Sequence, residues 1–374
     1  MELKLASLRK SERTAYLLRD LYESRGYRNF RMGKFEEYDF YVDHRDFLSS
    51  AQIITFTDLN GKLMALKPDV TMSIVKNTRA TAEFPERLYY SESVYRLSRE
   101  VREYKEIFQV GVEYIGAVTP YTDVELIDLA MKSLALIEAD YVLDISHMGF
   151  LTGFFSAIDA PAEAKKALMR CLESKNAHEL LSIAREYGVG PAQIAPFELL
   201  IRISGPMGTA LKDAQPLAAN AAMRDALREL ETLYSVFASA GNAQALRLDF
   251  SITNDSNYYN GLMFRGFVKS VPRAVLSGGR YDLLLRRMGK ERLQAIGFGI
   301  SFDEIDRYFK QPVQNKYDAI LLYGTDTDLS ALYQAMEALT KEGLKVCALT
   351  CPPDDVGGAK VYRIDGTKLA EVAL

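Results

Sequence analysis

The sequence predicts an α+β fold, an antiparallel sheet flanked by helices, followed by a small α/β domain. Three observations carry this prediction. Two pairs of β-prone runs before residue 120 indicate antiparallel strand pairs, residues from about 160 to 241 are rich in Ala, Leu, Glu and Lys at helical spacing, and a strand, helix, strand pattern begins near residue 319. We therefore divide the chain into a body (1–310) carrying a helical insertion (about 160–241), a linker (311–316) and a small α/β domain (317–374).

The composition is that of a globular protein. Hydrophobic residues make up 48% of the 374 residues and charged residues 26%, and the net charge is −4. This charge gives no global basic field, which argues against nucleic acid as a partner. The charged start MELKLASLRKSERTAY does not resemble a signal peptide, and no apolar run reaches the length of a membrane span. We expect a cytoplasmic protein without a membrane partner.

The cysteines and histidines predict neither a disulfide framework nor a metal site. There are three of each, too few and too scattered for either: Cys171, Cys347 and Cys351, and His44, His147 and His178. We therefore expect no bound metal and no cofactor.

The first hundred residues contain four predicted elements. An amphipathic helix begins at Ser11 and stops at Gly26. The aromatic-rich segment 27–47 predicts extended structure. Residues 53–66 predict a hairpin, since Asn60-Gly61 lies between two apolar runs and both residues tolerate positive φ. A helix follows over 70–81.

Asp69 and Thr71 lie at the corner between this hairpin and the next helix. A helix amino end and a ligand cleft would both favour polar side chains at such a corner. Capping and ligand binding are equally compatible with the pattern.

A second strand pair is predicted over 88–96 and 107–115. In the return strand Gln109, Gly111 and Glu113 share one face by the two-residue period, whereas Phe108 and Val110 point to the other. An amide and a carboxylate would thus lie across a glycine floor, which predicts a polar pocket on that face.

Periodicity also predicts helices and strands in the middle and at the end of the chain. A helix is predicted over 121–139, a strand over 141–146 and a helix over 149–155, before the helical insertion. In the last domain, strands over 319–323, 345–349 and 360–364 surround a helix over 328–342. Two strands joined by a helix predict a parallel pair.

The most informative stretch runs from Arg247 to Ile305. A tyrosine-rich segment, predicted as a strand, contributes Tyr258 and Tyr259, and Gly278-Gly279 predicts a turn or a close approach to a ligand. A glycine-laced strand then leads into a helix near Phe302. This combination predicts a small-molecule pocket.

Several motifs together resemble the class II histidyl-tRNA synthetase family over roughly residues 5 to 310. Lys67-Pro68-Asp69-Val70-Thr71 resembles its Arg-Pro-Glu-Gly-Thr corner, and the segments around Arg96 and Gln109 to Glu113 resemble its second signature. Asn257-Tyr258-Tyr259-Asn260-Gly261 and Leu276-Ser277-Gly278-Gly279-Arg280-Tyr281-Asp282 resemble its two histidine-specific elements. The resemblance implies a class II synthetase-like sheet.

The departures from this pattern bear on activity. The arginine of the third signature, which would bind the ATP triphosphate, falls on Glu304, and the catalytic arginine before the tyrosine element falls on Asn254. At about 5 Å and an effective dielectric near 20, each charge pair is worth roughly 3 kcal/mol, so an anion at Glu304 opposes triphosphate binding. The proline of the first signature falls on Gly33, and the last domain is shorter than an anticodon-binding domain.

A synthetase-like body without activation chemistry resembles the regulatory subunits of ATP phosphoribosyltransferase. That resemblance implies a chain without activity of its own, which assembles with a short-form catalytic phosphoribosyltransferase chain and contributes to histidine feedback in the first step of histidine biosynthesis. It further implies a homodimer within a hetero-oligomer, and free histidine as a ligand.

By resemblance, the histidine pocket would use Asp69, Thr71, Gln109, Glu113, Tyr258 and Tyr259. Acidic groups suit an α-ammonium, and an amide with a phenol suits imidazole nitrogens. Arg96 would face the ligand carboxylate or form a buried ion pair. Arg280 is equally consistent with the pocket and with an internal Arg to Asp contact. Histidine acting at the interface with the catalytic chain stays open.

Two other functions remain compatible with the sequence. One is a divergent synthetase-like enzyme that activates an amino acid, for which Asn254 and Glu304 are unfavourable. The other is an RNA-binding regulator derived from a synthetase, for which the low basicity is unfavourable.

Overall fold

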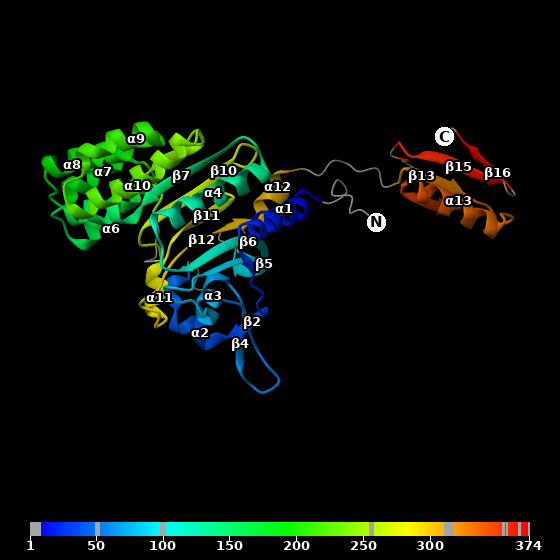
Figure 1. Cartoon of the computed structure of the whole chain (residues 1–374), viewed down its shortest axis with the longest axis horizontal. Helices are drawn as coiled ribbons and strands as arrows, with labels where there is room; N and C mark the ends of the chain where they lie inside the picture. Colours follow the sequence, from blue (N-terminus) through cyan, green and yellow to red (C-terminus); the bar gives the residue numbers. More distant parts are fainter. Residues whose placement is uncertain are drawn as a thin grey trace. The chain divides into compact units, whose positions relative to one another are not determined.

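The structure, a computed structural model, describes residues 9–48, 53–97, 102–253, 258–309, 317–353, 356, 358–365 and 368–372. The chain divides into two compact units, Met1–Phe309 and Lys310–Leu374 (Figure 1). The predicted linker over 311–316 lies outside the described residues. Among the described helices, none combines the length and the apolar character needed to cross a membrane.

A nine-stranded mixed sheet forms the centre of the first unit. Its strand order is β1-β5-β6-β12-β11-β10-β7-β9-β8. The bounds in that order are Arg28–Asn29, Glu86–Leu97, Tyr104–Gly116, Gln294–Ser301, Leu276–Arg280, Leu262–Val268, Tyr141–His147, Leu246–Asp249 and Ser204–Pro206. The strands from β5 to β7 pair antiparallel, as predicted, and the pairs β1 with β5 and β7 with β9 are parallel.

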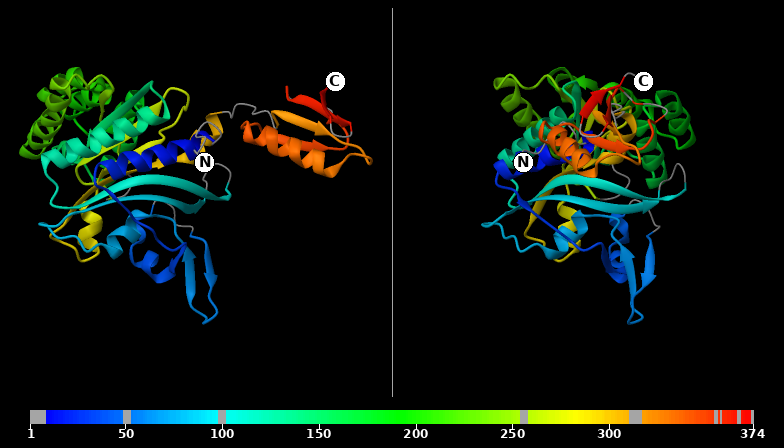
Figure 2. Two further views of the ribbon diagram at one scale, coloured as in Figure 1. Left: turned by 45° about the vertical axis from the view of Figure 1, so that its right-hand side comes forward. Right: turned by 90° about the vertical axis from the view of Figure 1, so that its right-hand side faces the viewer.

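Helices cover both faces of this sheet. Helices α1 (Lys10–Ser24) and α4 (Pro120–Ile137) pack on one face, where Leu18 and Leu134 join the main hydrophobic core. Helices α3 (Thr71–Asn77) and α11 (Asp282–Arg287) pack on the other face, as the turned views in Figure 2 show. Both faces of the sheet carry a hydrophobic core, and the second face also carries Glu113 with the glycines Gly111 and Gly297 of the neighbouring positions.

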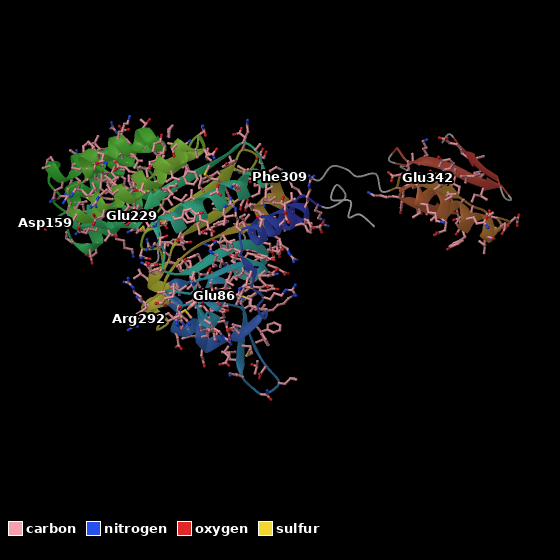
Figure 3. All side chains as sticks on the ribbon, in the orientation of Figure 1. Glu86, Asp159, Glu229, Arg292, Phe309 and Glu342 are labelled. Atoms are coloured by element: carbon pink, nitrogen blue, oxygen red, sulfur yellow. The ribbon has the colours of Figure 1, made fainter. Side chains whose placement is uncertain are left out.

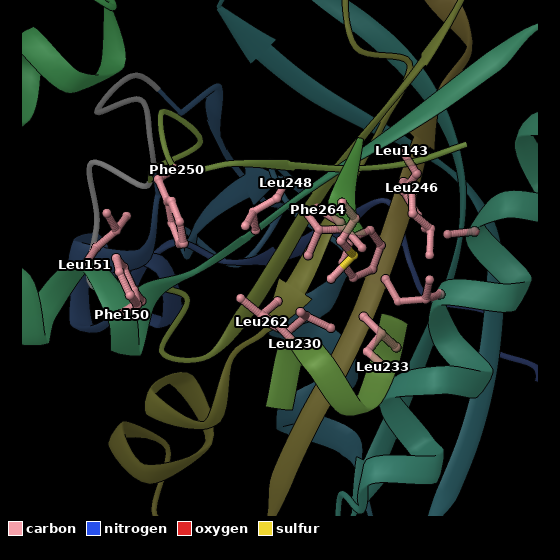
Figure 4. Close-up of a cluster of buried hydrophobic side chains, with 14 of the residues drawn as sticks. Leu143, Phe150, Leu151, Leu230, Leu233, Leu246, Leu248, Phe250, Leu262 and Phe264 are labelled. Atoms are coloured by element: carbon pink, nitrogen blue, oxygen red, sulfur yellow. The ribbon is translucent and has the colours of Figure 1, made fainter. Parts of the chain in front are cut away.

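The main core continues between the sheet and α10 (Ala221–Ser239). Leu143 of β7, Leu246 of β9 and Phe264 of β10 are buried with Leu230 and Leu233 of α10 (Figure 4). This contact fixes α10, the last helix of the helical segment, against strands β7, β9 and β10.

The segment from 160 to 241 is helical, with one exception. Its helices are α6 (Ala162–Glu173), α7 (Ala177–Glu186), α8 (Pro191–Arg202), α9 (Met207–Ala214), the 3-10 turn η3 (Gln215–Leu217) and α10, and α5 (Met148–Ser156) precedes them. The exception is β8, a three-residue strand that pairs with β9 at the edge of the sheet.

A small sheet of order β2-β4-β3 extends from the body (Figures 1 and 2). Its strands are Phe35–Glu37, Leu63–Leu66 and Thr55–Thr57, and Gly61 takes φ +80° in the predicted hairpin turn. The prediction of extended structure over 27–47 was partly wrong, because Tyr38–Asp43 forms helix α2 and Arg45–Phe47 a 3-10 turn, η2. Tyr41 explains the difference, since helical backbone turns its ring fully into the core.

Two local predictions after residue 257 were also wrong. Tyr258 and Tyr259 lie in a loop before β10, not in a strand. Their rings meet at 4.8 Å, whereas successive side chains of a strand point to opposite faces. Gly278 and Gly279 lie within strand β11, not in a turn. They are needed there for close approach, because a β-carbon on Gly279 would lie 2.7 Å from the carbonyl oxygen of Leu262.

The second unit is a four-stranded sheet of order β14-β13-β15-β16 with one helix. The elements are β13 (Ala319–Leu322), α13 (Leu329–Lys341), β14 (Val346–Leu349), β15 (Lys360–Asp365) and β16 (Lys368–Glu371). The predicted parallel pair is confirmed, since β13 pairs parallel with β14. The fourth strand, β16, was not predicted.

Candidate functional site

The candidate site lies on the face of the central sheet opposite the main core. Gly279 of β11 pairs with Gly297 of β12, and Gly297 pairs with Glu113 of β6. A β-carbon on Gly297 would overlap Oε2 of Glu113. The glycines therefore let the Glu113 carboxyl group lie flat on the sheet, which explains the glycine-laced sequence of β12.

Glu113 is the centre of the site. The hydroxyl of Thr71 donates to Oε1 at 2.6 Å, and the hydroxyl of Tyr281 donates to Oε2 at 2.6 Å. Burial raises the pKa of this carboxyl group to about 8, although both hydrogen bonds act to lower it. The carboxyl group therefore changes its charge within about one pH unit of neutrality. Residues from three separate parts of the chain, Glu113 itself, Thr71 and Tyr281, fix its position.

Tyrosine rings surround the Glu113 carboxyl group. Tyr258 packs edge-on against Tyr259 at 4.8 Å and lies 5.8 Å from the ring of Tyr281. Burial, with Glu113 among the nearby charges, raises the pKa of all three phenols, so their hydroxyl groups stay neutral. We call Thr71, Glu113, Tyr258, Tyr259 and Tyr281 the recognition cluster.

Asp69 and Arg96 border the recognition cluster as an ion pair. Nη2 of Arg96 lies 3.3 Å from Oδ2 of Asp69, and Nε donates to the carbonyl oxygen of Pro68 at 2.6 Å. The other Asp69 oxygen accepts from the backbone amide of Met72 at 2.9 Å, in the first turn of α3. Asp69 therefore fills the capping role that the sequence allowed, and its second oxygen orients Arg96.

Gln109 shares its strand face with Glu113, as predicted. It pairs with Ser301 of β12 and with Glu92 of β5, one rung beyond Gly111. Glu92 in turn forms an ion pair of 2.5 Å with the buried Lys67. Gln109 is thus on the same face as the recognition cluster, four residues along the strand from its carboxyl group.

Two residues of the site were missed at the sequence level. Tyr281 donates to Glu113. Tyr90 lies directly opposite Gly111 on β5, and a β-carbon on Gly111 would come within 2.5 Å of its hydroxyl oxygen. Tyr90 could have been found from its position opposite a glycine, but that position is known only once the strands are paired. Tyr281 could have been found from its place in the Gly-Gly-Arg-Tyr-Asp motif.

A cavity of about 330 Å³ adjoins the recognition cluster at Tyr259. Thr253, Arg265, Ser277 and Gly278 also line it. Ser277 and Gly279 lie on the same face of β11, so this cavity continues the polar face of the sheet. It offers hydroxyl groups and a guanidinium group next to the tyrosine wall.

Arg280 is not brought to the recognition cluster. It shares its strand face with Gly278, toward α4, and its Nε lies 3.3 Å from Oδ2 of Asp282. This is the internal contact that the motif allowed as its alternative. Asp282 is held by the Asn260 amide at 3.0 Å and by the backbone amide of Ala295 at 3.0 Å.

Glu304 lies in α12 (Phe302–Tyr308), where the strand β12 leads into a helix. Its Oε1 lies 3.3 Å from Nη1 of Arg307 and 3.9 Å from Nη1 of Arg273. We call these three residues the arginine–glutamate cluster. The glutamate neutralises cationic charge that would otherwise be available to a polyanion. Asn254 and Asn257 lie outside the described residues.

Neither metal nor thiol chemistry is suggested by the described residues. No group of three or more His, Cys, Asp or Glu side chains there could hold a metal ion. The three cysteines are free thiols. The site consists of one carboxyl group, hydroxyl groups and aromatic rings, a combination suited to binding an ammonium group and a small ring.

Comparisons with known proteins agree with this geometry. A family model described as histidyl-tRNA synthetase matches residues 1–305. The ATP phosphoribosyltransferase regulatory subunit of Oceanobacillus iheyensis is 26% identical over 317 residues, which cover 83% of this chain and 77% of that protein.

Solved structures show the same fold. A structure from Bacillus halodurans, titled as an ATP phosphoribosyltransferase regulatory subunit/histidyl-tRNA synthetase, superposes with a TM-score of 0.75 at 24% identity, covering 93% of this chain and 90% of that one. A chain of the ATP phosphoribosyl transferase complex from Thermotoga maritima gives a TM-score of 0.62 at 15% identity, covering 78% of this chain and 97% of that one. Both place the mixed sheet and its helices among class II synthetase-like folds.

Proposed function

Since the chain belongs to the histidyl-tRNA synthetase family, we infer that it acts within this family as a regulatory subunit of ATP phosphoribosyltransferase. It is a non-catalytic subunit in the first step of histidine biosynthesis, and its partner is the catalytic phosphoribosyltransferase chain. The relatives named as such regulatory subunits match most of its length.

We infer the loss of activation chemistry from one observation. Glu304 stands where the family has the arginine that would bind the ATP triphosphate, and it forms ion pairs with Arg273 and Arg307. Two arginines near this site are therefore engaged by an anion. An ATP-dependent activation step needs cations at the triphosphate, because charge neutralisation is the main contribution of the protein to such a step.

The recognition cluster is our proposed histidine site. The Glu113 carboxylate would bind the α-ammonium group, and the tyrosine rings would enclose the imidazole. Buried hydroxyl and carboxyl groups reject ligands that leave them without partners, which gives such a site its selectivity. In this proposal histidine binding to the regulatory chain is the feedback signal to the catalytic chain.

We assign homodimer formation to the small sheet β2-β4-β3. Phe35 and Phe56 pack edge-on at 5.0 Å on this sheet, yet the two side chains are 55% and 37% exposed, and Leu63 beside them is 44% exposed. Large apolar side chains gathered on one exposed sheet are typical of a surface that pairs with another chain. A second copy of this chain is the occupant we propose.

The test is to mix the purified chain with a short-form phosphoribosyltransferase catalytic chain. We expect the two to elute together in size-exclusion chromatography, the rate of phosphoribosyl transfer to rise, and histidine to inhibit the complex more strongly than the catalytic chain alone. A catalytic chain that neither binds this protein nor changes its rate would refute the assignment.

A second measurement separates a regulator from an enzyme. The chain alone is expected to support no histidine-dependent exchange between pyrophosphate and ATP, because Glu304 opposes triphosphate binding. Exchange above the background without enzyme would favour the alternative of an amino-acid-activating enzyme.

A further inference from the structure

The arginine of the Gly-Gly-Arg-Tyr-Asp motif lines a second cavity, apart from the recognition cluster. This cavity has a volume of about 690 Å³ and lies between the start of α4, the face of α10 and the end of β11. Arg280 of β11 and Asp123 of α4 line it, together with Arg228 and Glu229 of α10. Glu229 is labelled in Figure 3.

Two residues that line this cavity each carry a buried side-chain atom without a hydrogen bond. Oδ1 of Asp123 is buried and has no hydrogen-bond partner, and the same holds for Nε of Arg280, although Asp282 lies 3.3 Å from it as an ion partner. A buried polar atom without a hydrogen bond destabilises the folded chain. A ligand that draws these two side chains toward the cavity, and supplies a donor to Asp123 and an acceptor to Arg280, would remove both costs.

The remaining charges of the cavity define where each end of such a ligand would lie. Nε2 of His147 lies 3.1 Å from Oε2 of Glu229, and Nδ1 of His147 accepts from the backbone amide of Gly149, so the ring donates to the carboxylate. Arg228 is mostly exposed and pairs with Asp225 at the rim. The carboxyl groups of Asp123 and Glu229 thus form an anionic wall, and the guanidinium groups of Arg280 and Arg228 form the cationic counterpart.

Titration supports the same arrangement. Burial raises the pKa of Asp123 to about 7; nearby Arg280 opposes this shift, whereas Glu229 and Asp282 add to it. The pKa of Glu229 is lowered, chiefly by its hydrogen bond with His147. An ammonium group between the two carboxyl groups would favour the ionised form of Asp123 and release its proton.

We propose that this cavity binds a small zwitterion of the amino-acid type, with its ammonium group at Asp123 and Glu229 and its carboxylate at Arg280. Arg280 precedes Tyr281, whose hydroxyl group donates to Glu113. The second site is therefore connected to the recognition cluster through two adjacent residues, Arg280 at the end of β11 and Tyr281 directly after it. A ligand that moves Arg280 would act on the first site through Tyr281.

The test uses the full chain and three matched probes. L-ornithine carries both groups, putrescine lacks the carboxylate, and pentanoate lacks both ammonium groups. We expect saturable binding of ornithine by calorimetry, with both analogues weaker by about tenfold, since each loses one charged contact. In two buffers of different ionisation enthalpy at pH 7, ornithine binding is expected to release a fraction of a proton.

Variants then assign the binding to the cavity. Asp123→Asn is expected to lower the affinity for ornithine about tenfold and to abolish the proton release. The variant should fold, because an amide has the shape of the protonated carboxyl group that the folded chain already tolerates. Glu231→Gln is the matched control, because Glu231 lies on the same helix but contacts Gln215 outside the cavity. Absence of saturable ornithine binding, equal binding of the three probes, or equal effects of the two variants would overturn the proposal. Assembly with the catalytic chain is measured separately, so its failure is distinguishable from failure of the second site.

Discussion

The recognition cluster and the arginine–glutamate cluster differ in how their charges are used. Glu113 is buried, hydroxyl groups donate to both of its oxygens, and no cation among the described residues forms a hydrogen bond with it, so its carboxyl group can ionise against the cation of a ligand. Glu304 is held by Arg307 and faces Arg273, so its charge is already used within the chain. The first arrangement suits recognition, and the second replaces a binding function with an internal ion network.

The difference indicates that recognition of a ligand and the ATP-dependent activation reaction can be lost separately. The recognition cluster depends on glycines and on buried hydroxyl groups, which also support the packing of the sheet. The negative charge of Glu304 is compensated by ion pairs with Arg307 and Arg273, and these pairs involve none of the residues of the recognition cluster. Four predictions test this comparison, beginning with the largest expected effect on ligand binding.

Replacing Glu113 with Gln should weaken histidine binding about a hundredfold, or about 2.7 kcal/mol, because the ammonium group loses its buried anionic partner. Calorimetric titration with histidine measures the effect. Glu103→Gln, an exposed position before the same strand, is the control and should bind as the parent chain does. Equal affinities of the parent and Glu113→Gln would place histidine elsewhere.

Replacing Gly297 with Ala should lower the free energy of unfolding by about 2 kcal/mol, because the added methyl group overlaps the Glu113 carboxyl group. Histidine affinity should fall with it, since the carboxyl group must move. Chemical denaturation measures the first effect and calorimetry the second. Gly33→Ala is the control, as its β-carbon would come no closer than 3.5 Å to another atom. Unchanged stability of Gly297→Ala would mean that the sheet floor is not tightly packed.

The sequence predicted the polar face of β6, because the two-residue period places Gln109, Gly111 and Glu113 together. It did not predict which side Arg280 takes, since that depends on where β11 begins and on its pairing with β12. Tyr281 lies just past the end of β11, where strand alternation no longer applies, so its contact with Glu113 required the three-dimensional structure.

The fold was predictable where one signal dominated. The hairpin around Asn60-Gly61 and the helical segment beyond residue 160 follow from turn chemistry and periodicity. Helix α2 was not predictable in this way, because six residues give too little periodicity and the burial of Tyr41 decides the conformation. The loop at Tyr258 is a similar case, as ring packing overrides strand propensity.

The titration of Glu113 gives a pH dependence with a definite sign. Its folded-state pKa is raised to about 8 from an ordinary value of 4.5, so between these values the folded chain holds a proton that the unfolded chain has lost. The associated stability is complete below pH 4.5 and is lost as the pH rises through 8. The free energy of unfolding of the parent should therefore fall relative to Glu113→Gln between pH 5 and 8, by up to about 1.4 kcal/mol per unit. Denaturation of both proteins across this range checks the slope, and parallel curves would show that Glu113 is ionised in the fold.

The smallest expected effect is at Glu304. Replacing it with Gln removes the anion from Arg307 and Arg273, and because the two arginine side chains are half-exposed the loss of stability should stay below about 1 kcal/mol. Histidine affinity should not change, since the recognition cluster does not use this residue. Removal of the anion should let ATP bind a few-fold more tightly in an equilibrium assay at low salt, without restoring pyrophosphate exchange, because a neutral amide supplies no cation. A large loss of histidine affinity in Glu304→Gln would mean that the two clusters are coupled, and that recognition and activation were not lost separately in this chain.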